Sequence, residues 1–222
     1  MGEFAGSFSA IVFDCDGVII DSEPVANRVL AEQLGLDFGY EIAAEESHRR
    51  FTGMVIRDIL KEIEKETGVS APYGWSMQLW ERTREAFETE LQPIPGTQNL
   101  MDRLDKANLP WGIASQSHLP YLEHALGLVG VWERATGRIA SAKEVANPKP
   151  APDVYLLAFE RVGCEPASTI IIEDSPTGTR AGVAAGARVI GFANDRPARE
   201  LLYAGAVAAF ETMAEIQQAL GL

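Results

Sequence analysis

The stretch Ala10-Ile-Val-Phe-Asp-Cys-Asp-Gly17 joins a short apolar run to a loop that carries two carboxylates. Its four apolar residues are too few for a helix and suit a strand that is buried on both faces. Similar runs recur at 111–114 (WGIA), 169–172 (TIII) and 188–191 (RVIG), with a weaker one at 207–210. Helical patterns lie between or after them, at 151–162, 177–185 and 213–220. Strands that alternate with helices predict an α/β fold, a three-layer core with a parallel sheet.

Residues 23–91 break this rhythm. They show amphipathic helical patterns at 24–34, 40–50, 55–67 and 75–90 and no convincing strand. A crossover between parallel strands usually carries about one helix. We therefore expect an inserted all-α domain at 23–91 and a core domain built from 1–22 and 92–222. The segment Gln92-Pro-Ile-Pro-Gly96, which mixes stiff and flexible residues, is typical of a hinge.

The composition of the chain limits the classes of partner that we expect it to bind. The chain has 222 residues, 46% of them hydrophobic, and a formal net charge of −13. This acidic balance argues against a nucleic-acid partner, and no apolar run is long enough to predict a membrane partner. Cys15 and Cys164 are too few for a disulfide framework, and the start of the chain lacks a secretory pattern. We expect a cytoplasmic protein, and no coiled-coil pattern argues against a monomer.

Chemically active side chains follow several of the expected strands. In an open parallel sheet, ligands bind outside the carboxyl ends of the strands. Two acids follow the first strand, a serine follows the second, two acids follow 169–172, and a lysine lies in the proline-framed loop 147–150. The site residues expected at this edge are Asp14, Asp16, Ser115, Lys149, Glu173 and Asp174.

The acids predict a metal site. Carboxylates at positions i and i+2 of an extended segment share a side, and a further acid beside them adds repulsion. A hard cation such as Mg²⁺ relieves that repulsion. The expected metal ligands are Asp14, Asp16, Asp174 and Glu173, of which Glu173 either binds the ion or accepts hydrogen bonds beside it.

The same residues predict phosphoryl transfer. Asp14 is suited to attack phosphorus in line, and Asp16 to protonate the leaving oxygen and later take a proton from water. Gly17, lacking a side chain, would bring its N–H close to a phosphoryl oxygen. Ser115 would donate a hydrogen bond, and Lys149 would offset the charge of the transferring group and hold Asp14.

Four segments resemble the motifs of one family. Asp14-Cys-Asp-Gly-Val-Ile-Ile-Asp-Ser-Glu23 resembles the first motif of the haloacid dehalogenase superfamily, Ile113-Ala-Ser115 the second, Lys149-Pro150 the third and Ile172-Glu-Asp-Ser175 the fourth. With the helical insertion, they resemble the subgroup that includes β-phosphoglucomutase and phosphoglycolate phosphatase. The resemblance implies a Rossmann-like core whose cap closes over the substrate. It also implies a Mg²⁺-dependent phosphatase that hydrolyses a small phosphorylated metabolite, such as a sugar phosphate, through an aspartyl-phosphate.

Several alternatives compete with a phosphatase. A phosphosugar mutase resembling β-phosphoglucomutase would carry a histidine where Ala26 stands and basic groups where Thr52 and Ile56 stand. A haloacid dehalogenase would lack Asp16. Phosphonate cleavage would need a cap lysine that forms a Schiff base, and Lys61 and Lys65 lie in plain amphipathic patterns. A non-catalytic binding or regulatory protein would have no need of both a nucleophile and an acid/base.

Substrate contacts are expected from both domains. Arg50 and Arg57 either reach a substrate anion or belong to a solvated helix face. The candidate substrate-binding residues are Gly17, Glu23, Arg50, Thr52, Gly53, Arg57, Gln116 and Ser117.

Overall fold

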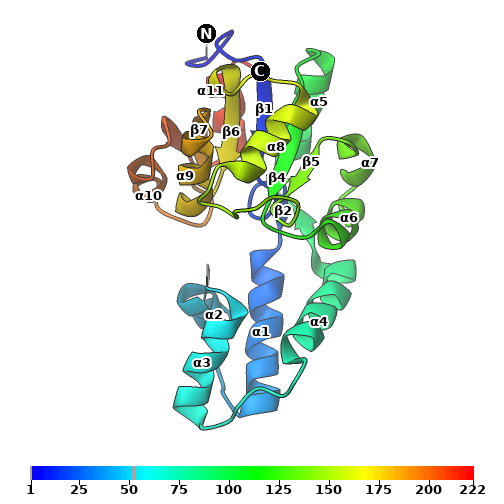
Figure 1. The fold of residues 1–222 in the computed structure, drawn as a ribbon, viewed down its shortest axis with the longest axis vertical. Coiled ribbons are helices and arrows are strands. Elements are labelled where there is room, and N and C mark those ends of the chain that lie inside the picture. The colour runs from blue at the N-terminus through cyan, green and yellow to red at the C-terminus, as the bar shows by residue number, and fades with distance from the viewer. Residues whose placement is uncertain (1, 52–53) are drawn as a thin grey trace. The chain divides into compact units, whose positions relative to one another are not determined.

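The structure, a computed structural model, describes residues 2–51 and 54–222. The chain forms two compact units, one made of Met1–Ile20 with Pro93–Leu222 and the other of Asp21–Gln92 (Figure 1). Short strands β2 (Ile20–Asp21) and β3 (Gln92–Pro93) pair with each other where the chain passes between the units. In the described part of the chain, no helix has both the length and the apolar character needed to cross a bilayer.

The first unit contains a six-stranded parallel sheet in the order β5-β4-β1-β6-β7-β8. Phe13 pairs with Ile113 of β4 on one side and with Ile172 of β6 on the other, so the carboxyl ends of these three parallel strands lie at the same edge of the sheet. The predicted α/β fold is confirmed, although the three-residue β5 gave no readable pattern. The strands are β1 (Ala10–Phe13), β4 (Trp111–Ser115), β5 (Ile139–Ser141), β6 (Thr169–Glu173), β7 (Arg188–Phe192) and β8 (Ala208–Phe210).

Both faces of this sheet are buried. Successive strand residues point to opposite faces. Val12 and Ile171 pack in one core cluster with Tyr155 of α8 (Asp153–Val162). Their neighbours Ile11 and Ile172 face the other way and are fully buried as well. Burial on both faces explains why these strands read as continuous apolar runs rather than as alternating ones.

Helices cover the sheet, and local signals set where several of them begin. Ser175 caps α9 by accepting a hydrogen bond from the Gly178 N–H at 3.0 Å, and Thr212 with Glu215 forms a capping box on α11. The helices expected at 151–162, 177–185 and 213–220 are confirmed. The helices of this unit are α5 (Thr97–Lys106), α6 (Leu119–Leu128), α7 (Trp132–Ala135), α8 (Asp153–Val162), α9 (Pro176–Ala184), α10 (Ala198–Tyr203) and α11 (Met213–Leu220), with a 3₁₀ turn at Pro166–Ser168.

The second unit consists of helices between β2 and β3. Leu34 of the first helix and Ile63 of the third are fully buried, as their helical spacing predicts. The Trp75 indole donates a hydrogen bond to Asp37 at 2.7 Å. The helices are α1 (Glu23–Phe38), α2 (Ala44–Phe51), α3 (Ile56–Thr67) and α4 (Trp75–Glu90), and each overlaps one of the four expected patterns.

Candidate active site

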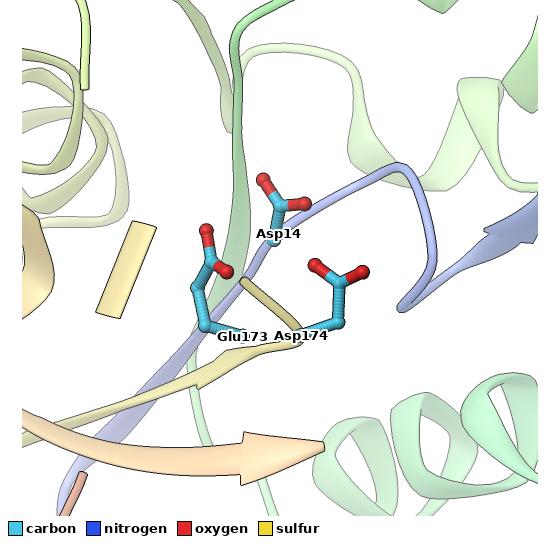
Figure 2. Close-up of side chains that lie close together, drawn as sticks. All are labelled: Asp14, Glu173 and Asp174. Carbon is cyan, nitrogen blue, oxygen red and sulfur yellow. The ribbon is translucent and has the colours of Figure 1, made fainter. Parts of the chain in front are cut away.

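Three carboxylates gather at the carboxyl edge of the sheet. Asp14 follows β1, Glu173 ends β6 and Asp174 comes next in the chain. One carboxylate oxygen from each lies within 4.8 Å of the others (Figure 2). The parallel register of β1 and β6 accounts for this meeting, since both strands leave the sheet at the same edge. Among the described residues, this group does not include Asp16.

Lys149 lies between two of these acids. Its Nζ is 2.5 Å from Asp14 Oδ1 and 2.8 Å from Glu173 Oε1, and it donates a further hydrogen bond to the Ala114 carbonyl at 3.2 Å. The Lys149 side chain is only 3% exposed, and Nζ lies 4.6 Å from the centre of the Tyr155 ring. The structure therefore brings Lys149 to Asp14 from a loop 135 residues further along the chain.

Protein donors surround the Glu173 carboxylate. Oε1 accepts hydrogen bonds from Lys149 and from the Tyr155 hydroxyl at 3.1 Å. Oε2 accepts from the Ser175 N–H at 2.7 Å and from the Ser175 hydroxyl at 2.9 Å. Each carboxylate oxygen has about two acceptor positions, so these four donors saturate the group.

A glycine makes room for this arrangement. A Cβ on residue 178 would lie 1.4 Å from Glu173 Oε1. A side chain there would displace the Glu173 carboxylate, and with it one of the two acids that hold Lys149. Glycine at position 178 is thus explained by packing against the site.

Burial dominates the electrostatics of the site. It raises the pKa of Asp14 to about 7, because Lys149 offsets only part of the burial penalty and the Glu173 charge adds to it. Burial disfavours the Lys149 ammonium, but the carboxylates of Asp14 and Glu173 outweigh it and hold the pKa of Lys149 well above its usual value. Burial, followed by the charges of Asp16 and Asp14, raises the pKa of Cys15, so its thiol stays protonated.

Asp16 has its own hydrogen-bond partners. The Ser117 hydroxyl donates to Oδ2 at 3.2 Å, and the Tyr121 hydroxyl of α6 donates to Oδ1. The Asp16 carboxylate is thus bound by two hydroxyls, and a role for it as a metal ligand stays a prediction.

Ser115 lies at the end of β4. It is buried, and its Oγ accepts a hydrogen bond from the Ser117 N–H at 3.0 Å. Accepting this bond leaves the hydroxyl proton of Ser115 for donation, as its predicted role requires.

Gln116 contacts the Lys149 backbone. Its Oε1 accepts from the Lys149 N–H at 3.2 Å and its Nε2 donates to the Lys149 carbonyl at 3.4 Å. Both ends of the amide therefore hold the backbone of Lys149, and a contact of Gln116 with substrate stays a prediction.

Gly17 lies in a turn beside Asp174. Its N–H donates to the Ile20 carbonyl at 2.8 Å, and a contact of this N–H with a phosphoryl oxygen stays a prediction. The residue has φ +78°, and a Cβ there would lie 2.3 Å from Asp174 Oδ2. Glycine is required because the backbone is left-handed and passes close to a carboxylate.

Arg50 of the helical unit is engaged within that unit. Its guanidinium forms ion pairs with Glu62, at 3.2 Å, and with Glu66, and it lies 5.0 Å from the centre of the Phe51 ring. Arg50 thus links α2 to α3 through these ion pairs, and its contact with a substrate stays a prediction.

Other predicted contacts of this unit remain open. The Arg57 side chain is 78% exposed and lies 3.6 Å from an Asp58 oxygen. Glu23 Oε2 lies 3.3 Å from His48 Nδ1. Thr52 and Gly53 lie outside the described residues.

Two tyrosines at the site were not anticipated. Tyr155 contacts Lys149 and Glu173 from α8, and Tyr121 contacts Asp16 from α6. Both belong to helices that follow a site loop by a few residues, and this position is the only signal that the sequence offers.

Comparisons with known proteins identify the family. The chain belongs to the haloacid dehalogenase-like hydrolase family, whose pattern it matches over residues 11–192. It is 30% identical over 190 residues to hexitol phosphatase A of Escherichia coli (strain K12), covering 81% of this chain and 80% of that one. It is 25% identical over 187 residues to 6-phosphogluconate phosphatase of the same organism, covering 84% and 83%.

A solved structure shares the fold. The HAD family hydrolase from Deinococcus radiodurans R1, solved with bound phosphate and sodium, superposes with a TM-score of 0.83 at 29% identity. The match covers 96% of this chain and 95% of that one.

Proposed function

We propose that this protein is a Mg²⁺-dependent phosphatase that hydrolyses a small phosphomonoester, such as a sugar phosphate, through an aspartyl-phosphate on Asp14. The observation that carries the proposal is the buried Lys149 ammonium, which bridges Asp14 and Glu173 beside the third carboxylate, Asp174. Aspartate becomes an effective nucleophile where its position is fixed and the charge of the transferring group is offset.

The donor set fits a hard divalent cation. Mg²⁺ prefers oxygen ligands and is commonly held by one or two carboxylates. Because protein donors saturate Glu173, we assign the ligand role to Asp14 and Asp174, with Glu173 holding Lys149. When bound, Mg²⁺ would neutralise phosphate charge and lower the repulsion that an anionic nucleophile meets.

The chain's own residues supply the remaining steps. Lys149 fixes one oxygen of Asp14, so the other oxygen is left to attack phosphorus. Asp16 donates a proton to the leaving oxygen as the P–O bond breaks. It then accepts a proton from the water that attacks the aspartyl-phosphate, which returns both aspartates to their starting states. Ser115 would donate a hydrogen bond to the transferring group.

The substrate class is inferred from the relatives. Those matched include a hexitol phosphatase, a 6-phosphogluconate phosphatase and a phosphorylated carbohydrates phosphatase. We propose that this chain likewise acts on a phosphorylated polyol, sugar or sugar acid. A helical cap at 23–91, a cytoplasmic location and a monomeric state stay predictions.

Hydrolysis assays test this proposal. We expect turnover of p-nitrophenyl phosphate and of members of a panel of hexitol, hexose and gluconate phosphates with Mg²⁺, and none with EDTA. Asp14→Asn should lower kcat at least about a thousandfold. Isomerisation of a hexose phosphate with a bisphosphate primer would indicate a mutase, and metal-free halide release a dehalogenase. Inertness toward the whole panel by a folded protein would contradict the proposal.

A further inference from the structure

The Asp16 carboxylate is held on both oxygens by one short stretch of chain. Ser117, in the loop after β4, donates to Oδ2 at 3.2 Å, and Tyr121, in the first turn of α6, donates to Oδ1. Hydrogen bonds to both oxygens fix the plane of a carboxylate as well as its position, whereas one bond leaves it free to rotate.

The two donors are themselves fixed. His118 caps α6, because its Nδ1 accepts a hydrogen bond from the Tyr121 N–H at 3.1 Å. The His118 and Tyr121 rings meet edge to face, with centroids 6.3 Å apart. The Ser117 carbonyl accepts a hydrogen bond from the Ser141 hydroxyl at 2.7 Å. Tyr121 and Ser117 therefore reach Asp16 from anchored backbone, as a supporting contact requires.

Hydroxyl groups are suitable hydrogen-bond partners for a carboxyl group that gains and loses a proton. A hydroxyl donates to a carboxylate and accepts from a carboxylic acid, whereas an N–H group can only donate. The Tyr121 and Ser117 hydroxyls can thus hold Asp16 before and after it gives up its proton.

We infer that Tyr121 is a positioning residue for phosphoryl transfer, whose hydroxyl aims Asp16 at the leaving oxygen and at the attacking water. This inference rests on the proposed function. Tyr121 neither touches phosphorus nor exchanges a proton with substrate; its effect passes through Asp16.

This role has a signature that depends on the leaving group. An alkyl leaving group needs protonation as it departs, whereas p-nitrophenolate is stable enough to leave with little help. The ratio kcat/KM reports the steps through formation of the aspartyl-phosphate, and kcat also includes its hydrolysis. If Asp16 is misaimed, kcat/KM should fall only for the alkyl leaving group, which needs protonation. If hydrolysis of the aspartyl-phosphate limits turnover, kcat should fall for both leaving groups.

Tyr121→Phe tests the inference, because it removes one oxygen and keeps the ring. Acid/base groups contribute about a hundredfold or more, so we expect kcat/KM for the best alkyl phosphate of the panel to fall about tenfold. The kcat/KM for p-nitrophenyl phosphate should change by less than about twofold. Tyr121→Leu should give the same pattern, since the hydroxyl and not the ring carries the effect. Tyr203→Phe, at an exposed position of α10, is the matched control.

The possible outcomes distinguish a failure of the role of Tyr121 from a failure of the proposed function. Equal losses of kcat/KM for both leaving groups, unchanged kinetics or faster turnover in Tyr121→Phe would overturn the role of Tyr121 while leaving the phosphatase in place. A wild-type protein that hydrolyses no phosphate ester would overturn the proposed function, and the inference with it. Circular dichroism of both Tyr121 variants separates these results from a loss of folding.

Discussion

Two cations of this protein each lie between two carboxylates, in different surroundings. Lys149 of the core unit contacts Asp14 and Glu173 with a side chain that is 3% exposed. Arg28 of the helical unit lies 2.6 Å from both Glu32 and Glu90, and its side chain is 34% exposed. The charges match, but water can replace the partners of Arg28 and has little access to Lys149.

The difference in burial determines how much the surrounding structure depends on each ion pair. An exposed ion pair contributes little because solvent competes for both charges. A buried pair contributes little compared with apolar packing, but removing one member leaves a charge without water or partner. Lys149 therefore supplies the buried positive charge that both Asp14 and Glu173 contact.

Substituting the two cations should show the largest difference. Lys149→Met leaves two carboxylates buried together, so we expect a loss of about 3–5 kcal/mol in the free energy of unfolding, measured with urea. Activity should also disappear. Arg28→Met should cost about 1 kcal/mol or less and leave kcat unchanged. Similar costs for the two variants would show that burial does not distinguish them.

The two neighbouring acids of β6 and its loop should separate metal binding from support of Lys149. Asp174→Asn should weaken Mg²⁺ binding about a hundredfold or more, because it removes a proposed ligand. Glu173→Gln should weaken it less and destabilise the fold more, since Lys149 loses a charged partner. Isothermal titration with Mg²⁺ and urea unfolding measure the two effects. The reverse pattern would make Glu173 the ligand.

The metal-free site should also respond to pH. Burial raises the pKa of Asp14 from its usual 3.8 to about 7. Across that window the folded protein keeps a proton that the unfolded chain has released, so the free energy of unfolding should fall as pH rises. Urea unfolding in EDTA should show this fall in the wild type and a smaller one in Asp14→Asn, which cannot titrate. Identical slopes would place the pKa of Asp14 near its usual value.

Among the substitutions at the site, the smallest effect is expected at Tyr155. Tyr155→Phe removes one of four donors to Glu173 and should cost about 1–3 kcal/mol of stability, with a modest loss of kcat. Tyr203→Phe, whose side chain is 94% exposed, should change stability by less than about 0.5 kcal/mol. Thermal unfolding compares the two. A neutral Tyr155→Phe would show that Lys149 and Ser175 suffice to hold Glu173.

The site residues whose positions follow from the strand order could be predicted from the sequence. Asp14 and Glu173 end neighbouring buried strands, so a parallel sheet had to bring them together, and the proline-framed loop marked Lys149. The strand β5 (Ile139–Ser141) was missed because three residues carry too little periodicity.

Side chains that depend on packing were not predictable in this way. Tyr121 and Tyr155 reach the site only because α6 and α8 take particular rotations against the sheet. Gln116 and Arg50 carry groups that suit a substrate, yet nearer protein partners bind them. The residue types also give no sign of the turn in which the Gly17 N–H donates to the Ile20 carbonyl.

Trapping the intermediate tests the central claim most directly. The wild type, acid-quenched during turnover of p-nitrophenyl phosphate with Mg²⁺, should carry a phosphoryl group that peptide mass spectrometry assigns to Asp14. Lys149→Met and Asp14→Asn should carry none. A phosphoryl group on another residue, or full turnover by Asp14→Asn, would contradict the account.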